Sequence, residues 1–92
     1  MNESEARQRL ADVNGTLDDA LLDARRELRE AERRLSDAVR ATQRHLDGIA
    51  VPEQFDVRAF ASGSVGVLEA YAEFRAAQAR RQQLDALAKQ LA

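Results

Sequence analysis

Few side chains in this sequence of 92 residues are suited to chemistry, and the first to consider is the single histidine, His45. Imidazole acts as a metal ligand or as an acid–base group near neutral pH. Either role needs partners, because a zinc site takes three or four protein ligands and a catalytic base is oriented by another group. The sequence has no Cys, and no Asp or Glu shares the helical face of His45. We therefore expect His45 to be a packing residue, with a pH-sensitive contact as the alternative.

Two other patterns share part of a known ligand-binding motif but lack residues that the motif needs. Glu69 and Glu73 are four apart, as carboxylate ligands of di-metal proteins are, but the accompanying Glu-x-x-His motif is missing. The segment Gly63-Ser64-Val65-Gly66 lacks the spacing and the lysine of a phosphate-binding loop. No pair of groups is placed for separate acid and base work. The sequence thus predicts no catalytic residue, no metal ligand and no cofactor, and we expect a protein that is not an enzyme.

Composition narrows the possible partners. The formal net charge of -2 and the pI near 5.4 disfavour general binding to nucleic acid or to an anionic membrane. The first residues have no apolar core of a signal peptide, and no apolar run approaches the roughly 18 residues of a membrane span. We expect a cytoplasmic protein with a protein partner, no nucleic acid and no membrane.

The rest of the sequence predicts long amphipathic helices, because apolar residues recur in heptads. Leucine and alanine alternate along the first such seam, and a small residue at every second position allows a partner helix to approach closely. From about residue 64 the seam resumes with spacings of 3 and 4, interrupted only by Arg81, whose stem can lie along the seam. The seam residues are Leu21, Leu28, Leu35, Ala24, Ala31, Ala38, Ala70, Ala77, Leu84 and Leu91.

Capping and turn signals predict the element boundaries. Asn2 with Glu5 has the spacing of a helix cap, Asn14-Gly15 is a turn dipeptide, and Thr16 with Asp19 looks like a second cap. These signals predict a helix over about 3–13, a break, and a long helix over about 16–47 that stops at Gly48.

The connector, about 48–63, is long enough to carry structure of its own. Pro52 predicts a turn, and Asp56 can cap a short helix from Val57, with Phe55 and Phe60 as a hydrophobic staple. Ser62-Gly63-Ser64 predicts a break before the last helix, about 64–91, and Gly66 in that helix suggests a close backbone approach.

Matched lengths and charges favour folding the two long helices back on each other. The expected fold class is all-α, with a single domain over 1–92 that forms an antiparallel, coiled-coil-like helical hairpin. Two helices alone bury little apolar surface, so the core needs a further element. Either the connector helix completes a small three-helix bundle, or a second copy of the chain completes a homodimer. Antiparallel folding should bring Glu69 and Glu73 near Arg40 and Arg44. On the charged outer face of the first helix, helical spacing predicts the ion pairs Arg26/Glu30, Glu30/Arg34 and Arg33/Asp37.

Four aromatic residues hold nearly all the aromatic area: Phe55, Phe60, Tyr71 and Phe74. They fill the core or form an exposed docking patch for a partner. The leading functional hypothesis is a self-associating adaptor, small chaperone or assembly subunit. The second is a helical inhibitor or regulator that docks on a larger enzyme or nucleic-acid machine through its acidic start or its aromatic connector.

The sequence resembles two known families of helical-hairpin proteins. Gly63 to Leu91, with its alanine-rich heptads, resembles the returning helix of outer-membrane efflux channel hairpins. The plan of two helices around a central break is similar to the helical-hairpin substrates of type VII secretion. The central Trp-x-Gly signature of that family is absent, because Phe60-Ala61-Ser62-Gly63 has the wrong spacing. Neither resemblance assigns a role to any residue.

Overall fold

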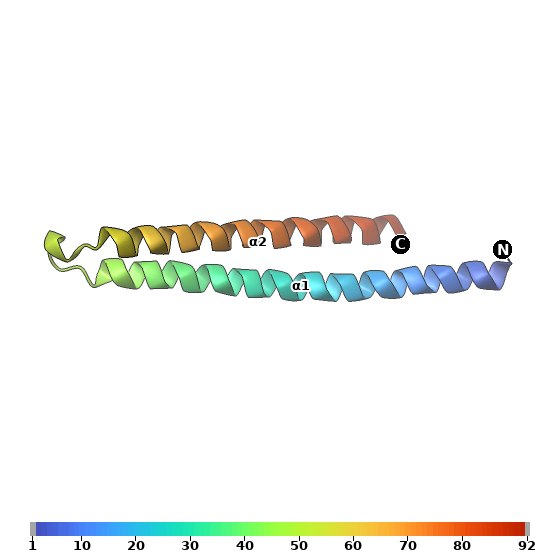
Figure 1. The fold of residues 1–92 in the computed structure, drawn as a ribbon. Coiled ribbons are helices and arrows are strands. Elements are labelled where there is room, and N and C mark those ends of the chain that lie inside the picture. Colours follow the sequence, from blue (N-terminus) through green and yellow to red (C-terminus); the bar gives the residue numbers. More distant parts are fainter. Residues whose placement is uncertain (1, 92) are drawn as a thin grey trace.

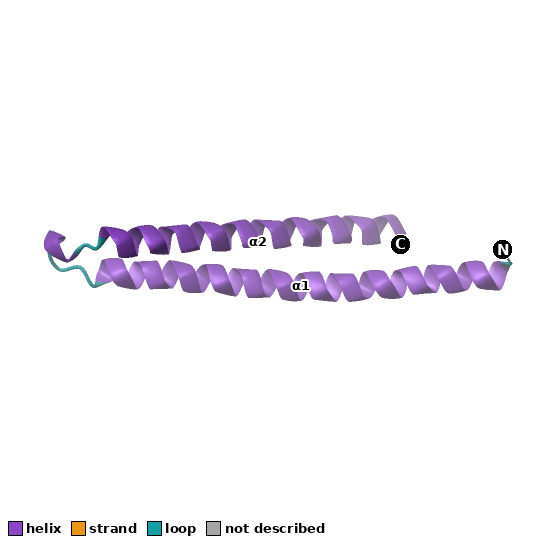
Figure 2. Ribbon diagram, viewed as in Figure 1, coloured by secondary structure: helices purple, strands orange, loops and turns teal. Residues whose placement is uncertain are grey.

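Two long helices lie antiparallel and side by side in the computed structural model, which describes residues 2–91 (Figures 1 and 2). Helix α1 spans Glu3–Asp47, helix α2 spans Val57–Leu91, and the 3-10 turn η1, Pro52–Gln54, lies between them. The rod measures 76 × 17 × 13 Å. The all-α hairpin predicted from the heptads is thereby confirmed, and the described residues include no strand.

Helix α1 begins and ends at residues suited to those positions. The Asn2 side chain accepts a hydrogen bond from the Glu5 amide at 2.8 Å, as the spacing predicted. This bond satisfies one of the amides that the first turn leaves without an intrahelical partner. At the other end Gly48 is the C-cap, and its amide donates to the Arg44 carbonyl at 3.1 Å.

The predicted break at Asn14-Gly15 is absent, and α1 runs through this dipeptide as one helix. Thr16 does not act as an N-cap acceptor there, because its hydroxyl donates to the Asp12 carbonyl at 2.9 Å, one helical turn back. Continuing the helix also keeps Leu10 and Leu17, seven residues apart, on one face. Gly15 thus costs helix propensity without causing a turn.

The connector contributes a tight turn and a cap instead of a separate helix. The Asp56 carboxylate accepts hydrogen bonds from the Arg58 and Ala59 amides at 3.0 and 3.1 Å, and the Phe55 and Phe60 rings lie 5.5 Å apart. The predicted cap and staple are confirmed. They open α2 itself, however, and among the described residues the only further helical element is the 3-10 turn η1.

No break occurs at Ser62-Gly63-Ser64, where the sequence predicted one. A helix that continues through these small residues keeps Phe60 and Val67, seven apart, on the same side. Gly63 is the close-approach glycine: a Cβ placed there would lie 2.9 Å from the Thr42 hydroxyl oxygen of α1. The prediction that Gly66 has this role is wrong, because a Cβ at Gly66 would meet no atom within 4 Å.

The core is a single line of leucine and alanine between the helices. Five hydrophobic residues of the described part of the chain are buried, four of them on α1. The remaining seam residues are half-buried except Leu91, which is 40% exposed at the end of α2. The alanines are among the most buried side chains, with Ala24 and Ala31 each 1% exposed, because the helix backbones approach closely at these positions. The buried residues are Leu17, Ala24, Leu28, Ala31 and Ala70.

The helices differ in length, so part of α1 has no helix beside it. Ion pairs join Arg34 to Glu73 at 3.1 Å and Glu27 to Arg80 at 2.9 Å, and in both pairs the residue numbers add up to 107. This register places Leu91 at the level of Thr16. The first turns of α1, residues 3–15, therefore extend past the end of α2 as an overhang (Figure 1). Within residues 2–91, neither helix has a stretch long and apolar enough to cross a lipid bilayer.

Candidate interaction surface

His45 lies in the helix contact next to the connector. Its Nε2 atom is buried without a hydrogen-bond partner, and its ring centroid is 6.2 Å from that of Phe55. In the part of the chain that the structure describes, no three His, Asp or Glu side chains converge to hold a metal ion. The imidazole therefore occupies a packing environment between α1 and the connector.

Glu73 of α2 pairs with an arginine of α1 other than those expected. It forms an ion pair with Arg34 at 3.1 Å, whereas the antiparallel fold was expected to bring it near Arg40 and Arg44. The register explains the difference, because Glu73 lies at the level of residue 34 of α1. Arg34 is thus turned toward α2, away from its predicted partner Glu30.

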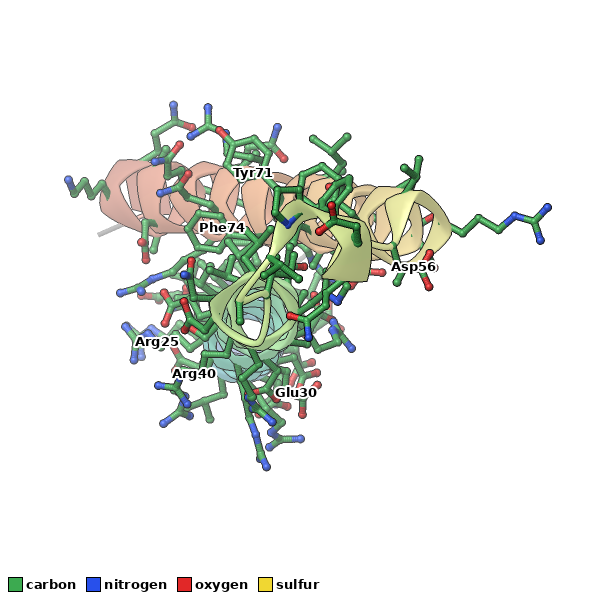
Figure 3. All side chains as sticks on the ribbon, turned by 90° about the vertical axis from the view of Figure 1, so that its left-hand side faces the viewer. Arg25, Glu30, Arg40, Asp56, Tyr71 and Phe74 are labelled. Atoms are coloured by element: carbon green, nitrogen blue, oxygen red, sulfur yellow. The ribbon has the colours of Figure 1, made fainter. Side chains whose placement is uncertain are left out.

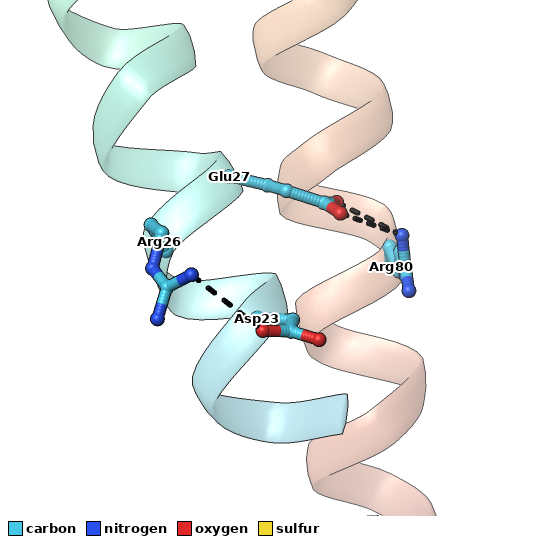
Figure 4. A network of polar contacts seen from close by, with 4 residues as sticks. All are labelled: Asp23, Arg26, Glu27 and Arg80. Atoms are coloured by element: carbon cyan, nitrogen blue, oxygen red, sulfur yellow. Dashed lines mark hydrogen bonds and ion pairs between the residues drawn. The ribbon is translucent and has the colours of Figure 1, made fainter. Parts of the chain in front are cut away.

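A second polar contact across the helices involves Arg80, and Figure 4 shows it together with its neighbours. One guanidinium nitrogen of Arg80 lies 2.9 Å from both carboxylate oxygens of Glu27. Arg26 is 3.9 Å from Asp23 instead of pairing with Glu30 as the spacing predicted. All four side chains are close to half exposed or more, so these ion pairs fix register more than they add stability.

The four aromatic residues form two separate pairs along one end of the hairpin. The Phe55 and Phe60 rings meet at an angle of 49° at the connector, and the rings of Tyr71 and Phe74 lie 6.5 Å apart further along α2. Phe60 and Phe74 are half-buried against α1, while Phe55 is 41% and Tyr71 is 50% exposed. Two of the four are therefore mainly core, and two present apolar area to solvent.

An uncharged, largely apolar surface covers one side of the hairpin near the connector, and we call it the loop-side patch. Val39, Leu46 and Leu68 are 46%, 38% and 66% exposed there, beside Tyr71. A shallow groove in the patch is lined by residues of both helices. Its position matches the end where Val39 and Leu46 widen the apolar stripe of α1. The patch consists of Val39, Gln43, Leu46, Ser64, Leu68 and Tyr71.

A second apolar groove lies at the opposite end of the rod, where α2 stops beside α1. Val13, Leu87 and Leu91 are 51%, 43% and 40% exposed there. Leu17, Ala20 and Leu84 form its floor together with the adjoining polar residues Asp12 and Thr16. Both grooves are open and shallow, a shape suited to a helix and poorly suited to a small enclosed ligand.

The outer side of α1 is charged, in contrast to both grooves. Glu30 and Arg40 project from α1 on the side away from α2 (Figure 3). Arg25 projects to one flank, where it lines a shallow groove with Arg29 and with Arg81 of α2. Such a mixed-charge face is typical of a helix side that remains in water.

No family is shown by comparison with known proteins. No protein-family model matches the chain, and no curated protein or solved structure was found to match it.

The exposed Leu68 and the Glu27–Arg80 contact were not predicted from the sequence. The signal for the contact was present, because Glu27 and Arg34 are seven apart on α1 while Glu73 and Arg80 are seven apart on α2. Opposite charges at equal spacing on two antiparallel helices define a register. Leu68 directly follows Val67 of the seam, and its helical position faces outward, where the side chain is 66% exposed.

Proposed function

We propose that this chain is a non-catalytic interaction module, a helical hairpin that self-associates and serves as an adaptor, small chaperone or assembly subunit in the cytoplasm. In this proposal the second copy covers the apolar surface that a connector helix would have covered in a three-helix bundle. The observation that carries the proposal is the amount of apolar surface that the hairpin leaves exposed.

The exposed area is much larger than that of a compact protein of the same size. The surface measures 7188 Å² for a mass of 10.2 kDa, whereas a compact monomer of that mass exposes about 5,300 Å². The radius of gyration, 21.3 Å, compares with about 12 Å for a compact domain of this length. The excess of about 1,900 Å² exceeds the roughly 800 Å² that each partner contributes to a stable interface of standard size.

Large hydrophobic side chains contribute to this exposed area. Within residues 2–91, thirteen large hydrophobic side chains are more than a third exposed, and most of them lie at the loop-side patch, the connector and the end of α2. Transfer of apolar area out of water contributes about 25 cal/mol per Å². A second hairpin that covers either groove gains this free energy without any change in the fold.

The test is the mass in solution, measured by light scattering coupled to size exclusion over a range of concentrations. We expect twice the 10.2 kDa of one chain, independent of concentration across the peak. A mass of 10.2 kDa at all concentrations, together with no binding of an apolar-surface dye, would contradict self-association.

A second candidate is an inhibitor or regulator that docks through the acidic start of α1. Asp18, Asp19 and Asp23 are exposed beside the overhang, and this end of α1 extends past the end of α2. Reversing these three charges should abolish inhibition of the partner enzyme under this hypothesis. In the self-association proposal, reversal of Asp19 and Asp23 alone leaves a folded protein that still forms a dimer, because neither residue belongs to the loop-side patch.

A further inference from the structure

We propose that the second copy packs on the loop-side patch with both connectors at the same end, so that α1 of each copy contacts α2 of the other around a two-fold axis along the rod. This inference rests on the proposed self-association and adds the surface and the orientation. The product is a four-helix bundle in which neighbouring helices are antiparallel, a common arrangement for paired hairpins.

The distribution of charge on this side of the hairpin supports the parallel orientation. The loop-side patch has no charged residue, whereas the same side further from the connector presents Asp18, Arg25 and Arg29. An isologous contact with both connectors together places patch on patch. Full overlap in the opposite orientation would place those three charges against Val39 and Leu68, where each would be desolvated without a partner.

The register within the hairpin then determines what meets across the interface. When the two copies lie at the same height, each residue of α1 lies at the level of one residue of the partner's α2. The numbers of these two residues add up to 107, as they do within one hairpin. Val39 lies at the level of the partner's Leu68, and Gln43 at that of the partner's Ser64. Val39 of α1 and Leu68 of α2, the most exposed of the large apolar side chains that each helix contributes to the patch, therefore cover each other across the interface.

The charges beyond the patch are complementary in this arrangement. Glu32 falls at the level of the partner's Arg75, and Asp18 at that of the partner's Lys89. Within residues 2–91 none of these four side chains forms an ion pair inside its own hairpin. At the levels of Arg25 and Arg29 the partner presents Gln82 and Gln78. Arg81, which lines the same groove as these two arginines, forms an ion pair with Asp85 of its own helix at 3.7 Å.

The first experiment compares two leucines on opposite sides of α2. Leu68→Glu places a charge in the patch, and Leu87→Glu is the matched control in the other groove; both leucines are exposed, at 66% and 43%. We expect the wild-type dimer and the Leu87→Glu dimer to persist while Leu68→Glu is a monomer with unchanged helix content by circular dichroism. A monomeric Leu87→Glu with a dimeric Leu68→Glu would overturn the inference, whereas a monomeric wild type would overturn self-association itself.

A charge swap tests the orientation of the partner. Glu32→Arg should raise the dimer Kd about tenfold, because two symmetric contacts become repulsive. Adding Arg75→Glu should restore the wild-type Kd. A double variant that binds more weakly than the single one would contradict the pairing.

A distance between labels distinguishes the two orientations directly. The chain has no Cys, so Gln90→Cys gives a single site for a nitroxide label at the exposed end of α2. The proposed bundle places the two labels within about 30 Å, since neighbouring helix axes are 8–10 Å apart. A separation above about 45 Å, which follows from antiparallel hairpins with helices of this length, would overturn the parallel arrangement.

Discussion

The two halves of the rod are held together by different means. In the half nearest the connector, residues 36–71, Gly63 packs against Thr42 and the Phe55–Phe60 pair closes the turn. In the other half, the open half, the leucine seam carries the contact. Both ion pairs that join the helices within residues 2–91 lie there. Shape thus determines the alignment near the connector, while hydrophobic burial and charge determine it toward the free ends.

Removing a seam leucine from the open half should have the largest effect. Leu28 is 7% exposed, so Leu28→Ala should lower the free energy of unfolding by about 3 kcal/mol through lost burial and the cavity left behind. Urea unfolding followed by circular dichroism, at a fixed protein concentration, measures this loss. Leu10→Ala is the control, because Leu10 is 54% exposed on the overhang, and it should cost less than about 1 kcal/mol. Equal losses at the two positions would contradict the assigned core.

Two glycine substitutions in the half nearest the connector should separate the effect of close helix packing from the effect of helix propensity. Gly63→Ala should destabilise the hairpin by about 1–2 kcal/mol, because its Cβ would meet the Thr42 hydroxyl at 2.9 Å. Gly66→Ala should stabilise it by about 1 kcal/mol, since helix propensity improves and the space is open. Thermal unfolding gives both values. Stabilisation by both variants would show that the helices tolerate a wider separation at Thr42.

Loss of the connector cap should have a smaller effect. Asp56→Ala removes the acceptor of two amide hydrogen bonds and should cost about 1 kcal/mol. Asp56→Asn retains an acceptor at the same position and should be close to wild type. The control Glu53→Ala changes an exposed residue of η1 and should leave the unfolding midpoint unchanged. A loss for Asn equal to that for Ala would argue against capping.

The ion pair between the helices should contribute least. Glu27→Gln should lower stability by no more than about 0.5 kcal/mol in low salt, and the difference should vanish in 1 M NaCl through screening. Glu30→Gln is the matched control on the outer side of α1 (Figure 3). A larger effect that persists in high salt would mean that Glu27 has a packing role.

Much of the fold was predictable because it depends on local and periodic signals. The heptads predicted the hairpin, and the caps at Asn2 and Asp56 were readable from short-range spacing. The Phe55–Phe60 staple followed from the same kind of local rule.

The errors arose where a local signal competed with packing between the helices. Asn14-Gly15 and Ser62-Gly63-Ser64 are good turn sequences, but a break would rotate Leu17 or Val67 off the contact face. Burial of a whole seam outweighs a propensity cost of about 1 kcal/mol for a glycine. The choice of Gly63 over Gly66 as the contact glycine depends on the register, which is a property of two helices and not of either sequence segment.

The antiparallel register has a consequence for how the chain folds. Contacts near the connector, such as Thr42 with Gly63, join residues close in sequence, whereas Leu17 and Leu91 share a groove at the far end of the chain. Closing the longer loop first would cost about 1 kcal/mol more in chain entropy. Folding should therefore begin at the connector and zip toward the free ends, with the capped turn formed in the transition state. Substitutions at Asp56 or Gly63 should then slow folding, while substitutions at Leu17 or Leu91 should chiefly speed unfolding.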